Sequence, residues 1–255
     1  MTRINCKSKS VRLFCGLIGL IICAPAMAEN NSFEGPYVGL SLGYGGSSVK
    51  EEKALWSQVG QIDFIGSGGE NSKGKGATGG LSLGYDWRFN NFTVGVDVSS
   101  NLMDARSNGT LLSFDETFGG PSDHVASSTK LKSIIAFKPK LGVVLDEQTR
   151  IYAMAGFATA RVSRTVTGLT GTTGDVFLDP GVTGSDSRRM NGYTAGIGAE
   201  RVIASGFSLA LELNYFDFGH EDFTYGGTTF GTASTMVQSV KVTYSAATLG
   251  VAYRF

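Results

Sequence analysis

The sequence predicts an all-β protein, an eight-stranded antiparallel up-and-down transmembrane β-barrel. The first observation is that 36 of the 255 residues are glycine, and each glycine inside a helix costs about 1 kcal/mol relative to alanine. The second is that apolar residues occupy every other position in eight segments, which is the period of a strand with two different faces. The third is that short turns alternate with long connections along the chain. A helical protein is therefore excluded.

The first 28 residues have the three-part layout of a secretory signal peptide. A basic start is followed by an apolar run over residues 13–23 and then by Ala26-Met27-Ala28. The apolar run is too short to span a bilayer as a helix, which takes about 20 residues. We expect Ala26 and Ala28 to mark the cleavage site, so that residues 1–28 are removed and residues 29–255 form the barrel.

All three cysteines, Cys6, Cys15 and Cys23, lie in this signal segment. The mature chain then has no disulfide scaffold and no cysteine metal site. Acylation of Cys23, as in a lipoprotein, is the alternative to cleavage after Ala28, but the residue before such a cysteine is normally small and here it is Ile22.

Charge excludes a nucleic-acid partner. The whole chain has 22 basic and 22 acidic side chains. Four of the basic ones lie in the signal segment, which leaves 18 basic against 22 acidic in the mature chain, a net charge of −4. No excess of Lys and Arg is present to neutralise phosphates.

The first four alternating segments cover residues 37–45, 77–89, 92–99 and 131–145. In each of them one face is apolar and the opposite face carries Gly, Ser, Thr and charged residues. Their apolar faces are, in order, Val38, Leu40, Leu42 and Tyr44; Leu81, Leu83, Tyr85, Trp87 and Phe89; Phe92, Val94, Val96 and Val98; Ile135, Phe137, Leu141, Val143 and Leu145. Pro139 lies in the fourth segment and cannot donate to a strand ladder, so we expect a bulge there.

The last four segments cover residues 150–162, 193–200, 207–215 and 248–255. The first of these alternates least clearly, with Ile151 and Phe157 on its apolar face. The other apolar faces are Tyr193, Ala195, Ile197 and Ala199; Phe207, Leu209, Leu211, Leu213 and Tyr215; Leu249, Val251, Tyr253 and Phe255.

The connections point to an outer-membrane barrel. Residues 90–91, 146–149 and 204–206 are predicted short turns, and residues 47–75, 103–128, 163–190 and 220–240 are predicted long loops. Short periplasmic turns and longer external loops are typical of outer-membrane barrels. A closed barrel pairs every backbone group, and strands of about 9–11 residues can cross the membrane. A soluble β-sandwich is the alternative, because its strands alternate too.

Three motifs resemble the small outer-membrane β-barrel family, which includes OmpA-like and OmpX-like eight-stranded barrels and immunogenic outer-membrane proteins of alpha-proteobacteria. They are Phe33-x-Gly35-x-Tyr37-Val38-Gly39, Gly192-Tyr193-Thr194-x-Gly196-x-Gly198-x-Glu200 and the terminal Gly250-Val251-Ala252-Tyr253-Arg254-Phe255. The resemblance implies export through the periplasm to the cell outer membrane, among outer-membrane lipid and lipopolysaccharide. It also implies that Leu249, Val251, Tyr253 and Phe255 form the signal read by the barrel-assembly machinery.

The polar faces place charged side chains of both signs in a narrow lumen, where they would have to pair. The candidates for lumen ion pairs are Asp86, Arg88, Asp97, Lys138, Lys140, Glu200, Glu212 and Arg254. These residues allow two interpretations, a packed and closed interior or a narrow small-ion pore gated by the ion pairs. Aromatic residues near both ends of the segments predict the two interfacial belts of a membrane barrel.

The function predicted from these observations is that of a structural, surface-exposed barrel whose loops serve as an interaction or antigenic surface for a host or surface ligand. A lipid-modifying enzyme and a haem-binding protein are distant alternatives. They would depend on His124 and His220, and His220-Glu221-Asp222 has no serine in the position that a deacylase barrel needs. We therefore expect no catalytic residue, no cofactor and no metal.

Overall fold

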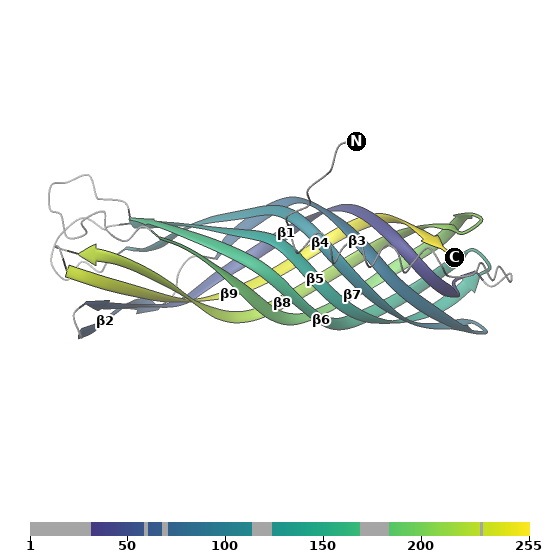
Figure 1. The fold of residues 1–255 in the computed structure, drawn as a ribbon, viewed down its shortest axis with the longest axis horizontal. Helices are drawn as coiled ribbons and strands as arrows, with labels where there is room; N and C mark the ends of the chain where they lie inside the picture. The colour runs from purple at the N-terminus through teal and green to yellow at the C-terminus, as the bar shows by residue number, and fades with distance from the viewer. Residues whose placement is uncertain (1–31, 59–60, 68–70, 114–123, 169–183, 230–231) are drawn as a thin grey trace, which may run out of the picture.

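The computed structural model describes residues 32–58, 61–67, 71–113, 124–168, 184–229 and 232–255. The predicted signal peptide, with Ala26, Ala28 and Cys23, lies outside these residues. Figure 1 shows long, tilted strands wound about one axis. The strands are β1 (Gly35–Gln58), β2 (Gln61–Ser67), β3 (Ser72–Phe89), β4 (Phe92–Ser113), β5 (His124–Asp146), β6 (Thr149–Gly168), β7 (Gly184–Ala204), β8 (Phe207–Thr229) and β9 (Thr232–Arg254).

The strands close into the predicted barrel. From β3 to β9 each strand pairs antiparallel with the next, β1 pairs with β3, and β1 pairs with β9 along almost its whole length. β2 pairs with the outer end of β1, beyond the point where β3 begins, and is an arm added to the eight-stranded wall. Within the described residues no helix is long and apolar enough to cross a membrane.

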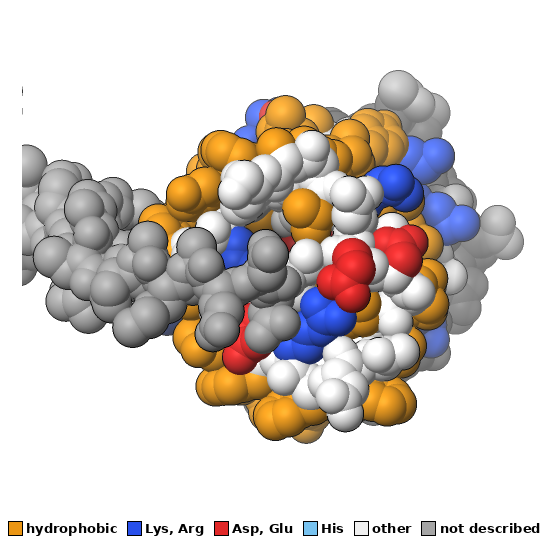
Figure 2. Space-filling model, turned by 90° about the vertical axis from the view of Figure 1, so that its right-hand side faces the viewer, with side chains coloured by type: hydrophobic (Ala, Val, Ile, Leu, Met, Phe, Trp, Pro, Cys, Tyr) orange, Lys and Arg blue, Asp and Glu red, His pale blue; other side chains and the backbone are white. Residues whose placement is uncertain are grey.

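The two faces of the wall are assigned by exposure. Large apolar side chains on the outside are 38 to 75% exposed, among them Leu42, Trp87 and Leu141, whereas Asp86 and Asp97 are buried on the inside. Figure 2 shows this from the short-turn end, where apolar side chains form the rim and charged ones lie in the middle. A soluble sandwich buries its apolar face, so this arrangement excludes that alternative.

Exposed aromatic residues gather at two levels of the outer wall. Trp87, Phe89 and Phe92 lie by the β3–β4 turn, and Tyr193 and Tyr215 lie near the middle of β7 and β8. Such belts mark the two interfaces of a membrane barrel. The stretch of wall between them is the membrane-spanning part.

The predicted long loops are largely wrong. The strands continue far past the outer aromatic belt, and β8 and β9 leave only residues 230–231 between them. The alternation reverses there, with apolar residues such as Val162 and Val166 facing inward and polar ones such as Thr165 facing outward. These strand extensions resemble loops in the sequence because their outward face is polar and only their inward face is apolar.

Beyond the belt the wall divides into two sheets. The ladder between β7 and β8 ends at the pair Tyr193 and Asp217, and the ladder between β3 and β4 ends at Gly74 and Ser107. The outer ends of β4–β7 therefore form one sheet, and those of β8, β9, β1 and β2 form the other; Figure 1 shows the two diverging. We call this part the outer sandwich. Its buried apolar core comprises Val49, Leu131, Val162, Val166, Phe223, Tyr225, Met236, Val240 and Val242.

The bulge expected at Pro139 is also wrong. Pro139 pairs in register with Val96 of β4. On the other side, the ladder with β6 is interrupted between Phe137–Phe157 and Lys140–Met154, with equal numbers of residues on both strands. Because Pro139 has no backbone N–H, the ladder has a gap here, but neither strand has the extra residue that a bulge requires. Gly156 faces this gap, where a Cβ atom would overlap the carbonyl oxygen of Phe137.

Candidate functional site

Charged side chains from seven strands, β3 to β9, meet inside the membrane-spanning part of the barrel. The alternation of each strand aims them inward, and seven of the eight predicted residues take part. They are Asp86, Asp97, Lys138, Lys140, Glu200, Glu212 and Arg254. We call these residues, together with Arg150, the lumen network.

Arg150 is the centre of the network and is not among the residues predicted from the sequence. The side chain is 2% exposed, and its guanidinium donates to Glu200 Oε2 at 2.5 and 2.9 Å and to Asp86 Oδ2 at 2.6 Å. Arg254 contacts the same two carboxylates at 3.1 Å from Asp86 and 3.3 Å from Glu200. Arg150 could have been found from its neighbour, because an outward Ile151 requires an inward Arg150.

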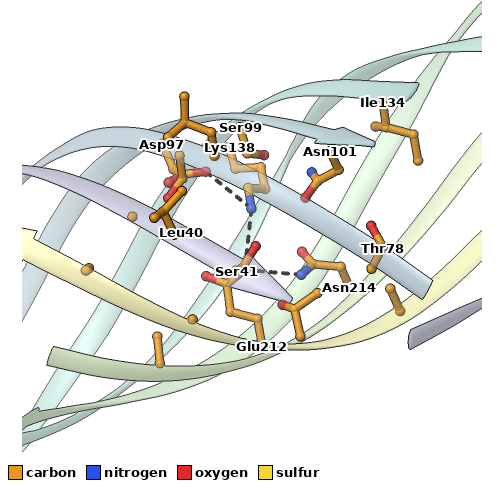
Figure 3. Close-up of a pocket in the computed structure, with 18 of the residues that line it drawn as sticks. Leu40, Ser41, Thr78, Asp97, Ser99, Asn101, Ile134, Lys138, Glu212 and Asn214 are labelled. Atoms are coloured by element: carbon orange, nitrogen blue, oxygen red, sulfur yellow. Dashed lines mark hydrogen bonds and ion pairs between the residues drawn. The ribbon is translucent and has the colours of Figure 1, made fainter. Parts of the chain in front are cut away.

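A second part of the network lies beside the first. Lys138 Nζ is 3.2 Å from Asp97 and 3.6 Å from Glu212, as drawn in Figure 3. The Tyr37 hydroxyl donates to Asp97 at 2.7 Å and accepts a hydrogen bond from Lys140 Nζ at 2.6 Å. Lys140 also lies 3.3 Å from Asp86 and joins the two parts.

The lumen network is electrically balanced. Its four carboxylates, Asp86, Asp97, Glu200 and Glu212, face four cations, Lys138, Lys140, Arg150 and Arg254. A buried ion without a partner costs several kcal/mol. Equal numbers of each sign therefore allow the charges to be buried together.

Arg88, the eighth predicted residue, lies apart from the network at the short-turn end. Its guanidinium donates to the carbonyl oxygens of Asn90 at 2.9 Å and Ser32 at 3.1 Å, and it is 3.7 Å from the exposed carboxylate of Glu147. These contacts hold the β3–β4 turn to the segment before β1. None of these contacts is with a residue of the lumen network.

Two glycines make room for Tyr37 and Tyr152, whose hydroxyls donate hydrogen bonds to carboxylates of the lumen network. Tyr37 pairs across the ladder with Gly84, and Tyr152 pairs with Gly198. A Cβ atom on Gly198 would come within 2.5 Å of Cζ of Tyr152, whose hydroxyl donates to Glu212 at 2.8 Å. These glycines are needed because large rings lie flat against the wall.

A cavity of about 70 Å³ borders the network on the side away from the short turns. The part nearer the network is polar, with Ser41, Ser99 and Asn214, as Figure 3 shows. Toward the cell exterior it is bounded by apolar side chains. These are Met103, Ile134, Phe216, Tyr244 and Ala246.

A second buried ion pair lies in the outer sandwich. Arg164 of β6 donates to Glu51 of β1, and both side chains are at most 2% exposed. The other oxygen of Glu51 accepts a hydrogen bond from Gln238 at 3.0 Å, and Arg164 donates to Thr129 at 3.2 Å. This pair was not predicted from the sequence, because both residues lie in segments predicted to be loops.

The remaining candidates lie elsewhere on the barrel. Leu249, Val251 and Tyr253 face outward on β9, and the Phe255 N–H donates to the Pro36 carbonyl at 3.1 Å. Their role in barrel assembly stays a prediction. His220 lies on the outer wall with Nε2 3.0 Å from Glu52. The side chain of His124 lies outside the described part of the chain, and the described residues hold no group of three metal-binding side chains.

Comparison with known proteins identifies the family. The profile of the outer membrane protein beta-barrel domain matches residues 15–255. The chain belongs to this family. The "31 kDa outer-membrane immunogenic protein" of Brucella melitensis is 24% identical over 236 residues, which cover 91% of this chain and 88% of the relative, and the protein of the same name in Brucella suis gives the same values. The resemblance seen in the sequence motifs, the barrel fold and the outer-membrane location are thereby confirmed.

Solved structures share the fold at low sequence identity. The outer membrane protease OmpT from Escherichia coli aligns with a TM-score of 0.51 at 10% identity, covering 88% of this chain and 98% of its own. Ail, the attachment invasion locus protein of Yersinia pestis, aligns with a TM-score of 0.37 at 16% identity, covering 87% and 99%. The likeness to OmpT concerns the fold alone.

Proposed function

We propose that this outer-membrane protein is a closed structural barrel that presents its outer sandwich at the cell surface and conducts neither ions nor solutes. The observation that carries the proposal is the order of layers along the lumen. The lumen network is followed by a layer of buried apolar side chains and then by the Glu51–Arg164 pair.

An ion crossing the lumen would meet each layer in turn. At the network it would have to separate Arg150 from Glu200 and Asp86, at 2.5 and 2.6 Å. At the apolar layer it would have to leave water among side chains such as Phe216 and Tyr244, and desolvation of an ion is costly. The layers in series favour the packed interior over the gated pore.

The outer sandwich supplies the surface that the sequence analysis assigned to loops. Its outward positions carry polar and charged side chains, for example Ser163, Thr165 and Arg189, on a rigid frame of paired strands. Rigid display favours recognition by antibodies or by a ligand of the cell surface. The name of the Brucella relatives describes them as immunogenic, which agrees with such exposure.

We also propose that the barrel has no catalytic activity. His220 Nε2 lies 3.0 Å from the Glu52 carboxylate on the outer wall, and Lys241 is the ladder partner of His220. A hydrolytic site needs a nucleophile within hydrogen-bond reach of a base. Among the contacts of the described residues, His220 has no serine, threonine or cysteine partner.

The proposal is tested by swelling of liposomes that contain the refolded mature chain. No swelling above that of empty liposomes is expected in small sugars or salts, and lipid recovered from the same liposomes should have unchanged mass. Swelling that scales with the amount of protein would contradict the closed lumen, and new lipid species would contradict the absence of catalysis.

A further inference from the structure

The outer wall just beyond the outer aromatic belt carries an uneven distribution of charge. On the outward face of β3–β7, seven basic residues accompany a single acidic one, Asp104, among the residues that the structure describes. The seven are Lys73, Lys75, Arg106, Lys130, Lys132, Arg161 and Arg189. We call these seven residues the basic band.

The strand register makes the band continuous. Lys75 pairs directly with Arg106, and Arg106 pairs with Lys130 on the next strand. Farther round the wall, Arg161 pairs directly with Arg189. Like charges on directly opposed residues destabilise a sheet. Their repetition across neighbouring strands is favourable only if an anion lies against them.

The protein itself neutralises little of this charge. Asp104 lies 2.8 Å from Lys130 and 3.6 Å from Arg106. No carboxylate in the described parts of the chain lies within ion-pair distance of Arg161 or Arg189.

The lysines on the other side of the wall have carboxylate partners. On β1 and β9, Lys50 contacts Glu52 at 3.6 Å and Lys241 contacts Asp217 at 3.1 Å. Among the described residues, the unneutralised basic surface thus lies on β3–β7.

The distance of the basic band beyond the outer aromatic belt matches the position of the lipid headgroups. Lys75 lies two residues past Ala77, the ladder partner of Tyr44, and Arg189 lies four residues from Tyr193. With a rise of about 3.3 Å per residue and a tilt of about 40°, these positions are about 5 to 10 Å beyond the belt. The headgroup region is about 5 to 8 Å thick on each side of the hydrocarbon core. Long Lys and Arg side chains reach across any remaining distance.

We propose that the basic band binds the phosphate groups of anionic lipid in the outer leaflet. The band faces sideways from the wall, so a lipid already in the leaflet reaches it without leaving the membrane. Guanidinium groups bind phosphate oxygens in bidentate geometry, which suits the paired Arg161 and Arg189. This assignment does not depend on whether the lumen conducts.

The test uses the mature chain refolded in neutral detergent, with diphosphorylated lipid A as the probe and native mass spectrometry to count retained lipid. Two variants carry the charge change: R106Q/R161Q/R189Q, and R161Q/R189Q in case the triple variant does not fold. The matched control is K50Q/K241Q, which removes two cations from the neutralised side. A heat-dependent gel shift verifies that each variant is folded.

We expect the wild type and the control to retain the lipid equally, and the triple variant to bind it on the order of tenfold or more weakly. Dephosphorylated lipid A should bind all variants alike, and added salt should reduce the difference. Equal weakening in the control, or equal binding of both lipids by the wild type, would overturn the proposal. Displacement of the lipid by inorganic phosphate or by a soluble sulfated glycan at similar concentration would also overturn it, since the site would then recognise a soluble anion.

Discussion

Replacing Arg150 by methionine should destabilise the barrel strongly. The side chain is 2% exposed and contacts two carboxylates at 2.5 and 2.6 Å. Methionine retains most of the volume but leaves Glu200 and Asp86 with only Arg254 and Lys140 as cationic partners. Removal of one partner of a buried ion pair costs about 3–5 kcal/mol, so we expect R150M to lower the free energy of unfolding by that amount.

The loss should be partly recovered when the charge balance is restored. In R150M/E200Q the lumen again holds equal numbers of each sign, so the double variant should lose about 1–3 kcal/mol less than the sum of the two single changes. The exposed pair of Lys50 and Glu52, at 3.6 Å, serves as control, and K50Q should cost less than about 1 kcal/mol. Urea unfolding in lipid vesicles, followed by tryptophan fluorescence, measures all four variants. Additive losses, or an R150M loss as small as that of K50Q, would refute the central role of Arg150.

Two further predictions concern the wall and the outer sandwich. In G198A the new Cβ must displace Tyr152, so we expect the free energy of unfolding to fall by about 1–3 kcal/mol in the same assay. The control is G226A, whose Cβ would have no atom within 4 Å, and it should change the free energy of unfolding little. Equal losses in the two variants would contradict the prediction that Gly198 makes room for Tyr152. Partial burial raises the pKa of Asp186, but hydrogen bonds from Arg188 and from the Thr224 N–H outweigh it and hold this pKa below its ordinary value. The ionised Asp186 therefore stabilises the fold above its unfolded-state pKa of about 3.9, and this stabilisation is lost as the pH falls through the lower folded-state pKa. As the pH falls through the folded-state pKa of Asp186, the hydrogen-exchange protection factor of the Thr224 amide should fall in the wild type but not in D186N. The same fall in both proteins would contradict this role of Asp186.

Much of the membrane-spanning wall could be predicted from the sequence. There the outward face meets lipid and must be apolar, so a single period of two identifies strand, face and register together. Val96 and Asp97 illustrate this, since they are adjacent and their difference in polarity alone assigns one to lipid and the other to the lumen. The same reasoning was available for Arg150, but the small residues around Gly156 obscured the alternation of β6.

The outer sandwich could not be predicted in the same way. Outside the membrane the outward face meets water, so Ser163 and Thr165 resemble loop residues, and only the inward Val162 and Val166 show that a strand continues. The burial of Glu51 against Arg164 depends on two segments more than a hundred residues apart in the chain. Contacts over such a separation have no signature within one segment.

Single-channel recording in a planar bilayer tests most directly the claim that side chains close the lumen. The wild-type barrel should give no stable conductance steps. The variant F216A/R150A, which truncates one side chain of the apolar layer and one of the lumen network, should give such steps under the same conditions. Stable steps in the wild type that change size when Glu200 or Lys138 is neutralised would contradict the closed barrel and establish the gated pore.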